Sequence, residues 1–275
     1  MVSRVLASND HVSGRIVTGR AWFDAPASRR VGSPSQEAVL SESPVSAASS
    51  PSLARLVAAG VLDAELGGLA ALLLDLGVPV LVAGPRGSGR RALLDALAAA
   101  LPAARRPDPA APNAERRLVR VAGTLSAATP AGLLRAALAA TGSRSGLAAT
   151  VEAPDLAGVI EVLRGQGLTG DEISFLGAVL VLGSAGTAGS AGRPAARVVA
   201  AHYLRPVARD AGGHVQRLGP AVLATWDAAR SQYDHFAWGI YPELAARTGR
   251  RAGDLEHEHR EWAGTLGARS VPGPA

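Results

Sequence analysis

The spacing of hydrophobic residues divides the chain near residue 53. Residues 1–52 show no sustained period and end in the serine- and proline-rich stretch "SESPVSAASSPS", which predicts a flexible segment. The residues that follow carry apolar side chains at helical spacing, and Ser52 and Asp63 stand where they can cap two successive helices. Gly77 ends the second helix. The change of pattern near residue 53 therefore predicts a polar N-terminal region followed by a folded domain.

Strand-like and helix-like patterns then alternate as far as residue 183. The predicted strands are short apolar runs, typical of strands buried on both faces of a sheet, at residues 78–84, 116–123, 146–153 and 176–183. The predicted helices cover residues 90–101, 129–142 and 154–167, and Thr129 and Pro130 form a helix-start signal for the second. This alternation predicts an α/β domain over residues 53–183, with a mainly parallel sheet flanked by helices.

The pattern changes again after residue 183. Residues 184–194, "SAGTAGSAGRP", are rich in glycine and small residues, which predicts a linker. Beyond them "ARVVAAHYLRPV" and "AVLATWD" favour strands separated by a turn at "RDAGGH", and residues 242–267 have helical spacing with charged faces. We therefore expect a smaller extension of strands and helices over residues 195–275.

Composition narrows the classes of protein that fit this pattern. A hydrophobic content of 48% and a charged content of 19% are ordinary for a globular protein. The chain has no cysteine, which excludes a disulfide scaffold and cysteine-ligated metal sites and is typical of a reducing compartment. The N-terminal residues contain no sustained apolar run, and the most apolar stretch is interrupted by Asp75, Gly77 and Pro79. We predict a cytoplasmic protein, at most peripheral to the inner face of the membrane.

The basic charge balance raises the question of a nucleic-acid partner. The formal net charge is +5, and all 28 basic residues are arginine because the sequence has no lysine. The arginines are spread along the whole chain, with no dense tract and no interleaved aromatic side chains on which bases could stack. The sequence therefore makes a nucleic-acid-associated module the least favoured candidate function.

The stretch "LVAGPRGSGRRALLDALAAAL" combines a strand, a glycine-rich turn and a helix. That arrangement fits the phosphate-binding pattern G-x-x-x-x-G-K-[ST], with Gly84 at its first position and Gly89 at its sixth. The glycines permit a backbone that directs N–H groups and the positive end of the helix dipole toward a phosphate. The predicted ligand-binding residues are Gly84, Pro85, Arg86, Gly87, Ser88, Gly89, Arg90 and Arg91.

The last two positions of this pattern carry the wrong side chains. Arg90 replaces a lysine whose slim charge reaches the β- and γ-phosphates, and arginine is longer and forked. Arg91 replaces the hydroxyl residue that binds Mg²⁺, and an arginine cannot ligate a cation. We predict weak binding of ATP or ADP, no Mg²⁺ site and impaired hydrolysis, and the sequence assigns no catalytic residue and no metal ligand.

These motifs resemble those of the type II/IV secretion ATPases, particularly the pilus-assembly (Tad-like) branch, and the resemblance covers residues 53–205. The family's loop reads GPTGSGKTTLLNAL, and the matching residues here are Gly84, Pro85, Gly87, Ser88, Gly89, Leu93, Leu94, Ala96 and Leu97. More faintly, "LLRAALAATGSRSGLAATVEA" resembles the family's AMNTGHDGSLSTVHA, with Glu152 in place of the histidine. "AGTLSAATPAG" stands where the Walker B segment GEVRGPEA is expected, with Thr124 in place of the glutamate.

The resemblance implies a P-loop (RecA-like) fold for residues 53–183, with residues 1–52 flexible or a remnant of the family's N-terminal domain. The departures at Arg90, Arg91, Thr124 and Glu152 indicate a degenerate and truncated member. The implied function is a scaffold or modulator of a secretion or pilus-assembly machine. Its implied partners are further copies or secretion ATPase subunits in an oligomer, and a membrane-platform protein. The alternative is an active, ATP-hydrolysing motor subunit of such a machine.

Histidine and aromatic residues predict no second site. His257 and His259 are two apart on a predicted helix and point to different faces, so we expect a solvated helix rather than a metal site. No stretch fits the G-x-S-x-G pattern of a serine nucleophile. The aromatic residues of "TWDAARSQYDHFAWGIY" predict core packing in the C-terminal unit, with a partner-docking surface as the alternative.

Overall fold

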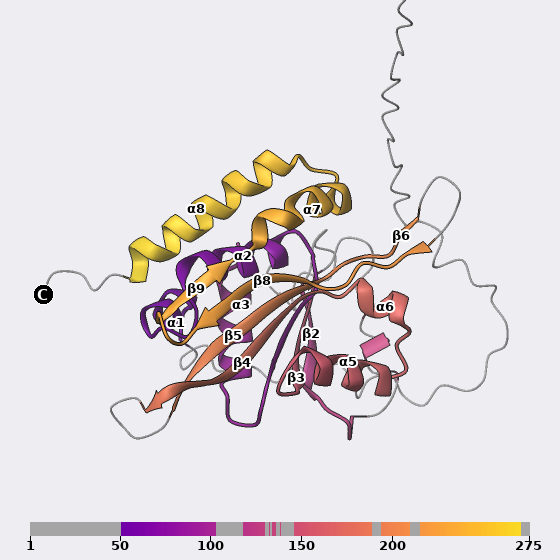
Figure 1. The fold of residues 1–275 in the computed structure, drawn as a ribbon, viewed down its shortest axis with the longest axis horizontal. Coiled ribbons are helices and arrows are strands. Elements are labelled where there is room, and N and C mark those ends of the chain that lie inside the picture. Colours follow the sequence, from indigo (N-terminus) through magenta and orange to yellow (C-terminus); the bar gives the residue numbers. More distant parts are fainter. Residues whose placement is uncertain are drawn as a thin grey trace, which may run out of the picture.

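The computed structural model shows an α/β fold built on a seven-stranded mixed sheet (Figure 1). It describes residues 51–102, 118–129, 132, 134, 135, 138, 146–188, 194–209 and 215–270. The strand order is β2-β3-β1-β4-β5-β8-β9. Strands β2, β3, β1 and β4 pair in parallel, whereas β5, β8 and β9 add antiparallel strands beyond β4. The predicted α/β class and parallel core are confirmed, and the sheet as a whole is mixed.

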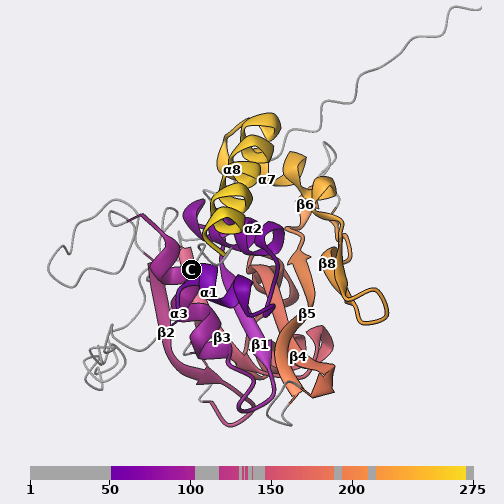
Figure 2. The same cartoon turned by 90° about the vertical axis from the view of Figure 1, so that its left-hand side faces the viewer.

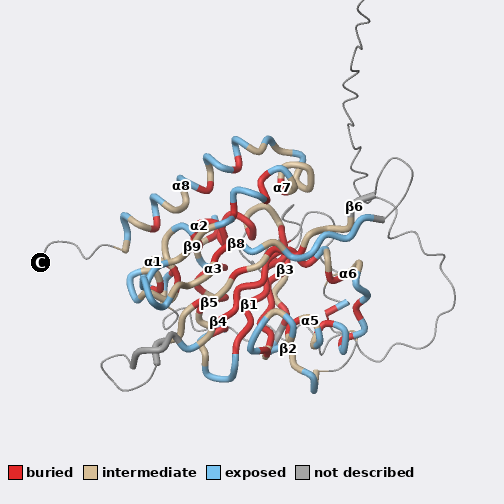
Figure 3. The backbone as a smooth tube through the Cα atoms, in the orientation of Figure 1, coloured by how far each residue is buried: buried red, intermediate tan, exposed pale blue. Residues whose placement is uncertain are grey.

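The parallel strands are apolar because helices cover both faces of the sheet. They are β1 (Val80–Gly84), β2 (Leu118–Leu125), β3 (Gly146–Glu152) and β4 (Gly177–Ala188). All five residues of the central strand β1 are buried, and they alternate between two hydrophobic clusters, Val80 and Val82 in one and Leu81 and Ala83 in the other. Buried residues accordingly concentrate along the middle strands (Figure 3).

Helices from both ends of the chain cover one face of the sheet. They include α1 (Leu53–Ala58), α2 (Ala64–Asp75), α3 (Arg90–Ala100) and the C-terminal α8 (Ala252–Ser270), which lies along α2 (Figure 2). Gly68 permits this close approach, because a Cβ there would stand 2.7 Å from the backbone nitrogen of Ala263. The other face packs against α5 (Leu156–Gly165) and α6 (Gly170–Ser174).

The helix starts follow the capping signals in the sequence. Ser52 accepts a hydrogen bond from the Arg55 N–H at 3.3 Å, and Asp63 accepts one from the Leu66 N–H at 2.9 Å. Gly77, with φ of 78°, turns the chain from α2 toward β1. These predictions are confirmed, whereas the predicted helix over residues 129–142 lies largely outside the described residues.

The predicted linker at residues 184–194 needs correction, because residues 184–188 continue β4. They pair antiparallel with β5 (Pro194–Leu204), with Ser184 opposite Ala196. The following strands β8 (Ala221–Asp227) and β9 (Gln232–His235) extend the same sheet rather than forming a separate one. The remaining C-terminal elements are the pair β6 (Ala208–Arg209) and β7 (Val215–Gln216), the 3₁₀ helix η4 (Ala237–Ile240), and α7 (Tyr241–Thr248).

The C-terminal aromatic residues divide between the core and the surface. Trp226 and Tyr233 pack edge to face with ring centroids 5.1 Å apart, and Tyr241 is buried against His259. Phe236 and Trp238, in contrast, are exposed. Core packing is therefore confirmed only for the first group. Within the described part of the chain, no helix has the length and apolarity needed to cross a membrane.

Candidate phosphate-binding loop

Residues 84–91, here called the glycine loop, connect the carboxyl end of β1 to the first turn of α3. Gly84, Gly87 and Gly89 have φ angles of 155°, 78° and 85°, a region that favours glycine. Gly84 is also tightly enclosed, because a Cβ there would lie 2.6 Å from Ser88 Oγ and 2.9 Å from the Leu182 carbonyl oxygen. The loop therefore folds back over the end of its own strand, and glycine at position 84 is required for that path.

The glycine loop lies where the chain leaves the sheet in two directions. From β1 the chain enters α3 on one face, and from neighbouring β3 it enters α5 on the other face. The carboxyl ends of parallel strands at such a reversal form the crevice in which α/β proteins bind ligands. A solvent-open depression of about 420 Å³ lies at this edge, lined by Pro85, Arg86, Glu152, Ala153 and Pro154.

Backbone N–H groups of the loop are free to bind an anion. Gly89, the N-cap of α3, has no side chain to cap the helix. Among the described residues, only the N–H of Ser88 has a loop acceptor, the Pro85 carbonyl at 3.2 Å, and no acceptor contacts the N–H groups of Gly87, Gly89, Arg90, Arg91 and Ala92. Ser88 Oγ is buried without a hydrogen-bond partner. Donors therefore concentrate at the positive end of the α3 dipole.

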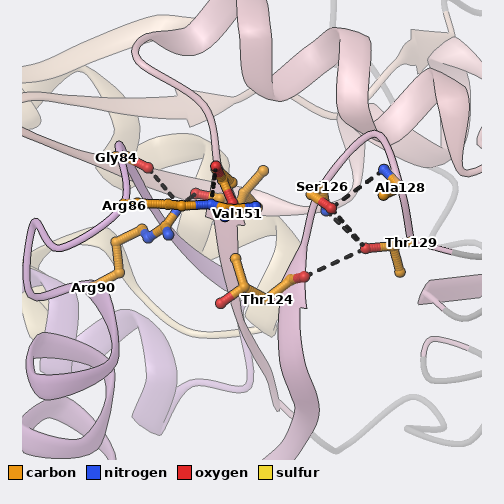
Figure 4. Close-up of polar contacts among 9 residues, drawn as sticks. Gly84, Arg86, Arg90, Thr124, Ser126, Ala128, Thr129 and Val151 are labelled. Atoms are coloured by element: carbon orange, nitrogen blue, oxygen red, sulfur yellow. Dashed lines mark hydrogen bonds and ion pairs between the residues drawn. The ribbon is translucent and has the colours of Figure 1, made fainter.

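Arg90 is buried and tied to the backbone of both central strands (Figure 4). Its Nη1 donates to the carbonyl oxygens of Gly84 and Val151, the latter at 2.8 Å. Burial lowers the pKa of the Arg90 guanidinium, and the nearby Glu152 carboxylate counteracts that shift, so the side chain stays charged at neutral pH. The guanidinium thus joins the start of the loop to the end of β3.

Glu152 ends β3 directly beside the loop. It lies opposite Gly84 in the parallel register of β1 and β3, and its Oε1 accepts a hydrogen bond from Arg86 Nε at 2.8 Å. The Arg86 side chain is 85% exposed, whereas that of Glu152 is 31% exposed. The ion pair therefore lies in the lining of the depression and joins the front of the loop to the end of β3.

Thr124, near the carboxyl end of β2, takes part in a hydroxyl network. Its Oγ1 lies 2.9 Å from Thr150 Oγ1, and Thr150 also donates to the Gly123 carbonyl oxygen at 3.2 Å. Thr129 donates to the Thr124 carbonyl oxygen at 3.3 Å and accepts from the Ser126 N–H at 2.8 Å. Hydroxyls of this kind hold β2 against β3, but they cannot abstract a proton from water at neutral pH.

No group of three histidine, aspartate or glutamate side chains within the described ranges could hold a metal ion. Arg91 is exposed at the second position of α3, where the motif requires a hydroxyl. His259 is buried and bonds to Tyr241 Oη and the Glu65 carbonyl oxygen, and His257 pairs with Glu261.

The sequence-predicted residues do lie together, but the sequence missed two of the contacts that organise them. Gly84, Pro85, Arg86, Gly87, Ser88, Gly89, Arg90 and Arg91 form one continuous turn between β1 and α3. The Arg86–Glu152 pair and the bond from Arg90 to the Val151 carbonyl join residues more than 60 positions apart, which local pattern does not reveal. The nearest signal is the prediction of two parallel strands ending at Gly84 and Ala153, because such ends share an edge.

Comparison with known proteins adds no further assignment. No protein-family model matches the chain, and no curated protein matches it either. The chemistry of the glycine loop is therefore inferred from its own geometry.

Proposed function

We propose that the glycine loop binds the phosphate tail of a nucleotide such as ATP or ADP without hydrolysing it, as in a degenerate P-loop (RecA-like) NTPase. The first support is position, since the loop lies at the carboxyl ends of β1 and β3 where the connecting helices diverge to opposite faces. The second is its supply of unpaired backbone N–H groups at the start of an 11-residue helix.

The charge at the start of α3 is the observation that carries this proposal. The helix begins with Arg90 and Arg91 and has no acidic residue in its first turn. Two cations at the positive end of a helix dipole oppose the helix, whereas an anion there stabilises it. A bound phosphate would relieve that repulsion and supply acceptors for the free N–H groups.

ATP hydrolysis needs chemical groups that Arg90, Arg91 and Thr124 do not supply. Phosphoryl transfer requires a metal ion to stabilise the developing charge and a residue to orient the attacking water. Arg91 offers no oxygen to a metal. Thr124 has no carboxylate to orient a water molecule, and its hydroxyl contacts Thr150. Arg90 is bonded to two backbone carbonyls. Arg90 and Thr124 instead hold the carboxyl edge of the sheet together.

The cellular role that we propose follows the resemblance to secretion ATPases. A nucleotide-binding subunit without turnover would act as a scaffold or modulator in a secretion or pilus-assembly machine, within an oligomer of further copies or active ATPase subunits. Nucleotide would then stabilise the subunit by mass action instead of driving movement through hydrolysis. The active motor subunit remains the competing function, and metal dependence separates the two.

Calorimetric titration with ATP, with and without Mg²⁺, tests the proposal. We expect weak binding in the chelated buffer and up to about thirtyfold weaker binding in excess Mg²⁺, because Mg²⁺ removes two charges that the arginines otherwise attract, each worth about 1 kcal/mol in water at 4 Å. Binding that requires Mg²⁺ would support the motor subunit instead. Absence of binding in both buffers would contradict a nucleotide site altogether.

A further inference from the structure

Two arginines and one carboxylate form a compact charge cluster at the glycine loop. Glu152 pairs with Arg86 at 2.8 Å, and its charge also acts on the buried Arg90 guanidinium. Arg86 and Arg90 in turn repel each other. Glu152 is the carboxylate in the lining of the depression, which otherwise consists of Arg86 and three apolar residues.

We propose that the Glu152 carboxylate competes with a phosphate of the ligand for Arg86, and so sets the affinity of the loop for polyanions. This inference rests on the proposed nucleotide site and adds its control residue. A carboxylate and a phosphate oxygen accept the same charge-assisted hydrogen bonds from a guanidinium. A ligand phosphate that reaches Arg86 must therefore displace the carboxylate.

Breaking the Arg86–Glu152 ion pair costs little free energy because the Arg86 side chain is exposed. The Arg86 side chain is 85% exposed, so it can leave Glu152 without opening the core. Exposed ion pairs contribute only about 0–1 kcal/mol, less than a polyphosphate gains from several charge-assisted bonds. Glu152 itself is held at the end of β3 by its register with Gly84. The backbone of Glu152 therefore stays beside the site while the exposed Arg86 side chain changes partner.

Replacing Glu152 with glutamine removes the charge and keeps the shape. We expect Glu152→Gln to bind sodium pyrophosphate about five- to tenfold more tightly than the wild type at low salt, since a unit charge a few ångströms away is worth about 1 kcal/mol in water. Glu161→Gln is the matched control. It makes the same change of net charge at an exposed position of α5, where the described residues show no ion pair. This control should leave affinity unchanged.

A third variant tests the mobile partner. Arg86→Ala should weaken pyrophosphate binding by about the same factor, because the ligand loses a cation that it would otherwise recruit. Thermal unfolding of each variant shows whether the fold is retained. Equal affinity of wild type and Glu152→Gln would overturn the competition, as would weaker binding by that variant, which would make Glu152 a ligand-binding group.

The two proposals fail in different ways. If the wild type binds pyrophosphate and Glu152→Gln binds it equally, the nucleotide site stands and the competition by Glu152 falls. If only Glu152→Gln binds pyrophosphate, the competition is supported, but the wild-type chain does not bind a nucleotide as proposed. If neither binds pyrophosphate or ATP at millimolar concentration, both the site and its control residue are wrong.

Discussion

Replacement of Arg90 with alanine is expected to lower the free energy of unfolding by about 3 kcal/mol and to abolish ATP binding. Arg90 is only 8% exposed, and its side chain bridges the carbonyl oxygens of Gly84 and Val151. Hydrogen bonds from a charged group contribute about 1.5–3 kcal/mol each, and the alanine variant leaves both carbonyls with a lost partner. The β1–β3 edge then loosens where the loop begins, so stability and ligand affinity fall together.

Arg91→Ala provides the matched control for that experiment. Arg91 is the next residue of α3, but it is exposed and makes no ion pair among the described residues. Urea unfolding should show a change within about 0.5 kcal/mol for Arg91→Ala, as for surface substitutions in general. If Arg90→Ala were as stable as Arg91→Ala, the Arg90 bridge between the two strands would contribute nothing to the free energy of unfolding.

Replacement of Gly84 with alanine is expected to lower the free energy of unfolding by about 3–4 kcal/mol. An added Cβ would stand 2.6 Å from Ser88 Oγ, 2.9 Å from the Leu182 carbonyl oxygen and 3.0 Å from Leu182 Cβ. The backbone at φ of 155° is also one that alanine rarely adopts. Overpacking costs about 1–3 kcal/mol, and an unfavourable backbone conformation costs a similar amount.

Gly87→Ala separates the steric part of this effect from the conformational part. Gly87 has φ of 78°, but nothing lies within 4 Å of the Cβ that alanine would add. Its variant should therefore lose only about 1 kcal/mol in the same urea titration. Equal losses at the two positions would mean that the loop does not fold back over β1 as described.

The core of the fold could be predicted because local signals and tertiary structure agree there. The strand that ends at Gly84 is apolar on both faces, and the caps at Ser52 and Asp63 are made by side chains next to the helices that they start. Residues 184–188 could not be assigned in the same way. They are small and weakly apolar, and they form a strand through pairing with β5, so a composition typical of loops is overridden by backbone hydrogen bonds.

The candidate site shows the same division between local and distant information. The turn from Gly84 to Arg91 follows from glycine spacing between a strand and a helix, and the sequence predicts it directly. The direction of the Arg90 side chain depends on which strand lies next to β1, and the sequence does not specify the strand order. The role of Glu152 likewise follows from the register that sets it opposite Gly84.

The most direct test of the central claim is the fate of ATP held by the purified protein. The protein is dialysed to equilibrium against ATP and Mg²⁺, released phosphate is measured, and the nucleotide bound at equilibrium is quantified and identified beside the Arg90→Ala variant. Nucleotide binding without turnover predicts excess intact ATP on the side of the wild type, none on the side of the variant, and phosphate no higher than in the protein-free blank. Phosphate release by the wild type that Arg90→Ala abolishes would contradict it and identify a working motor subunit.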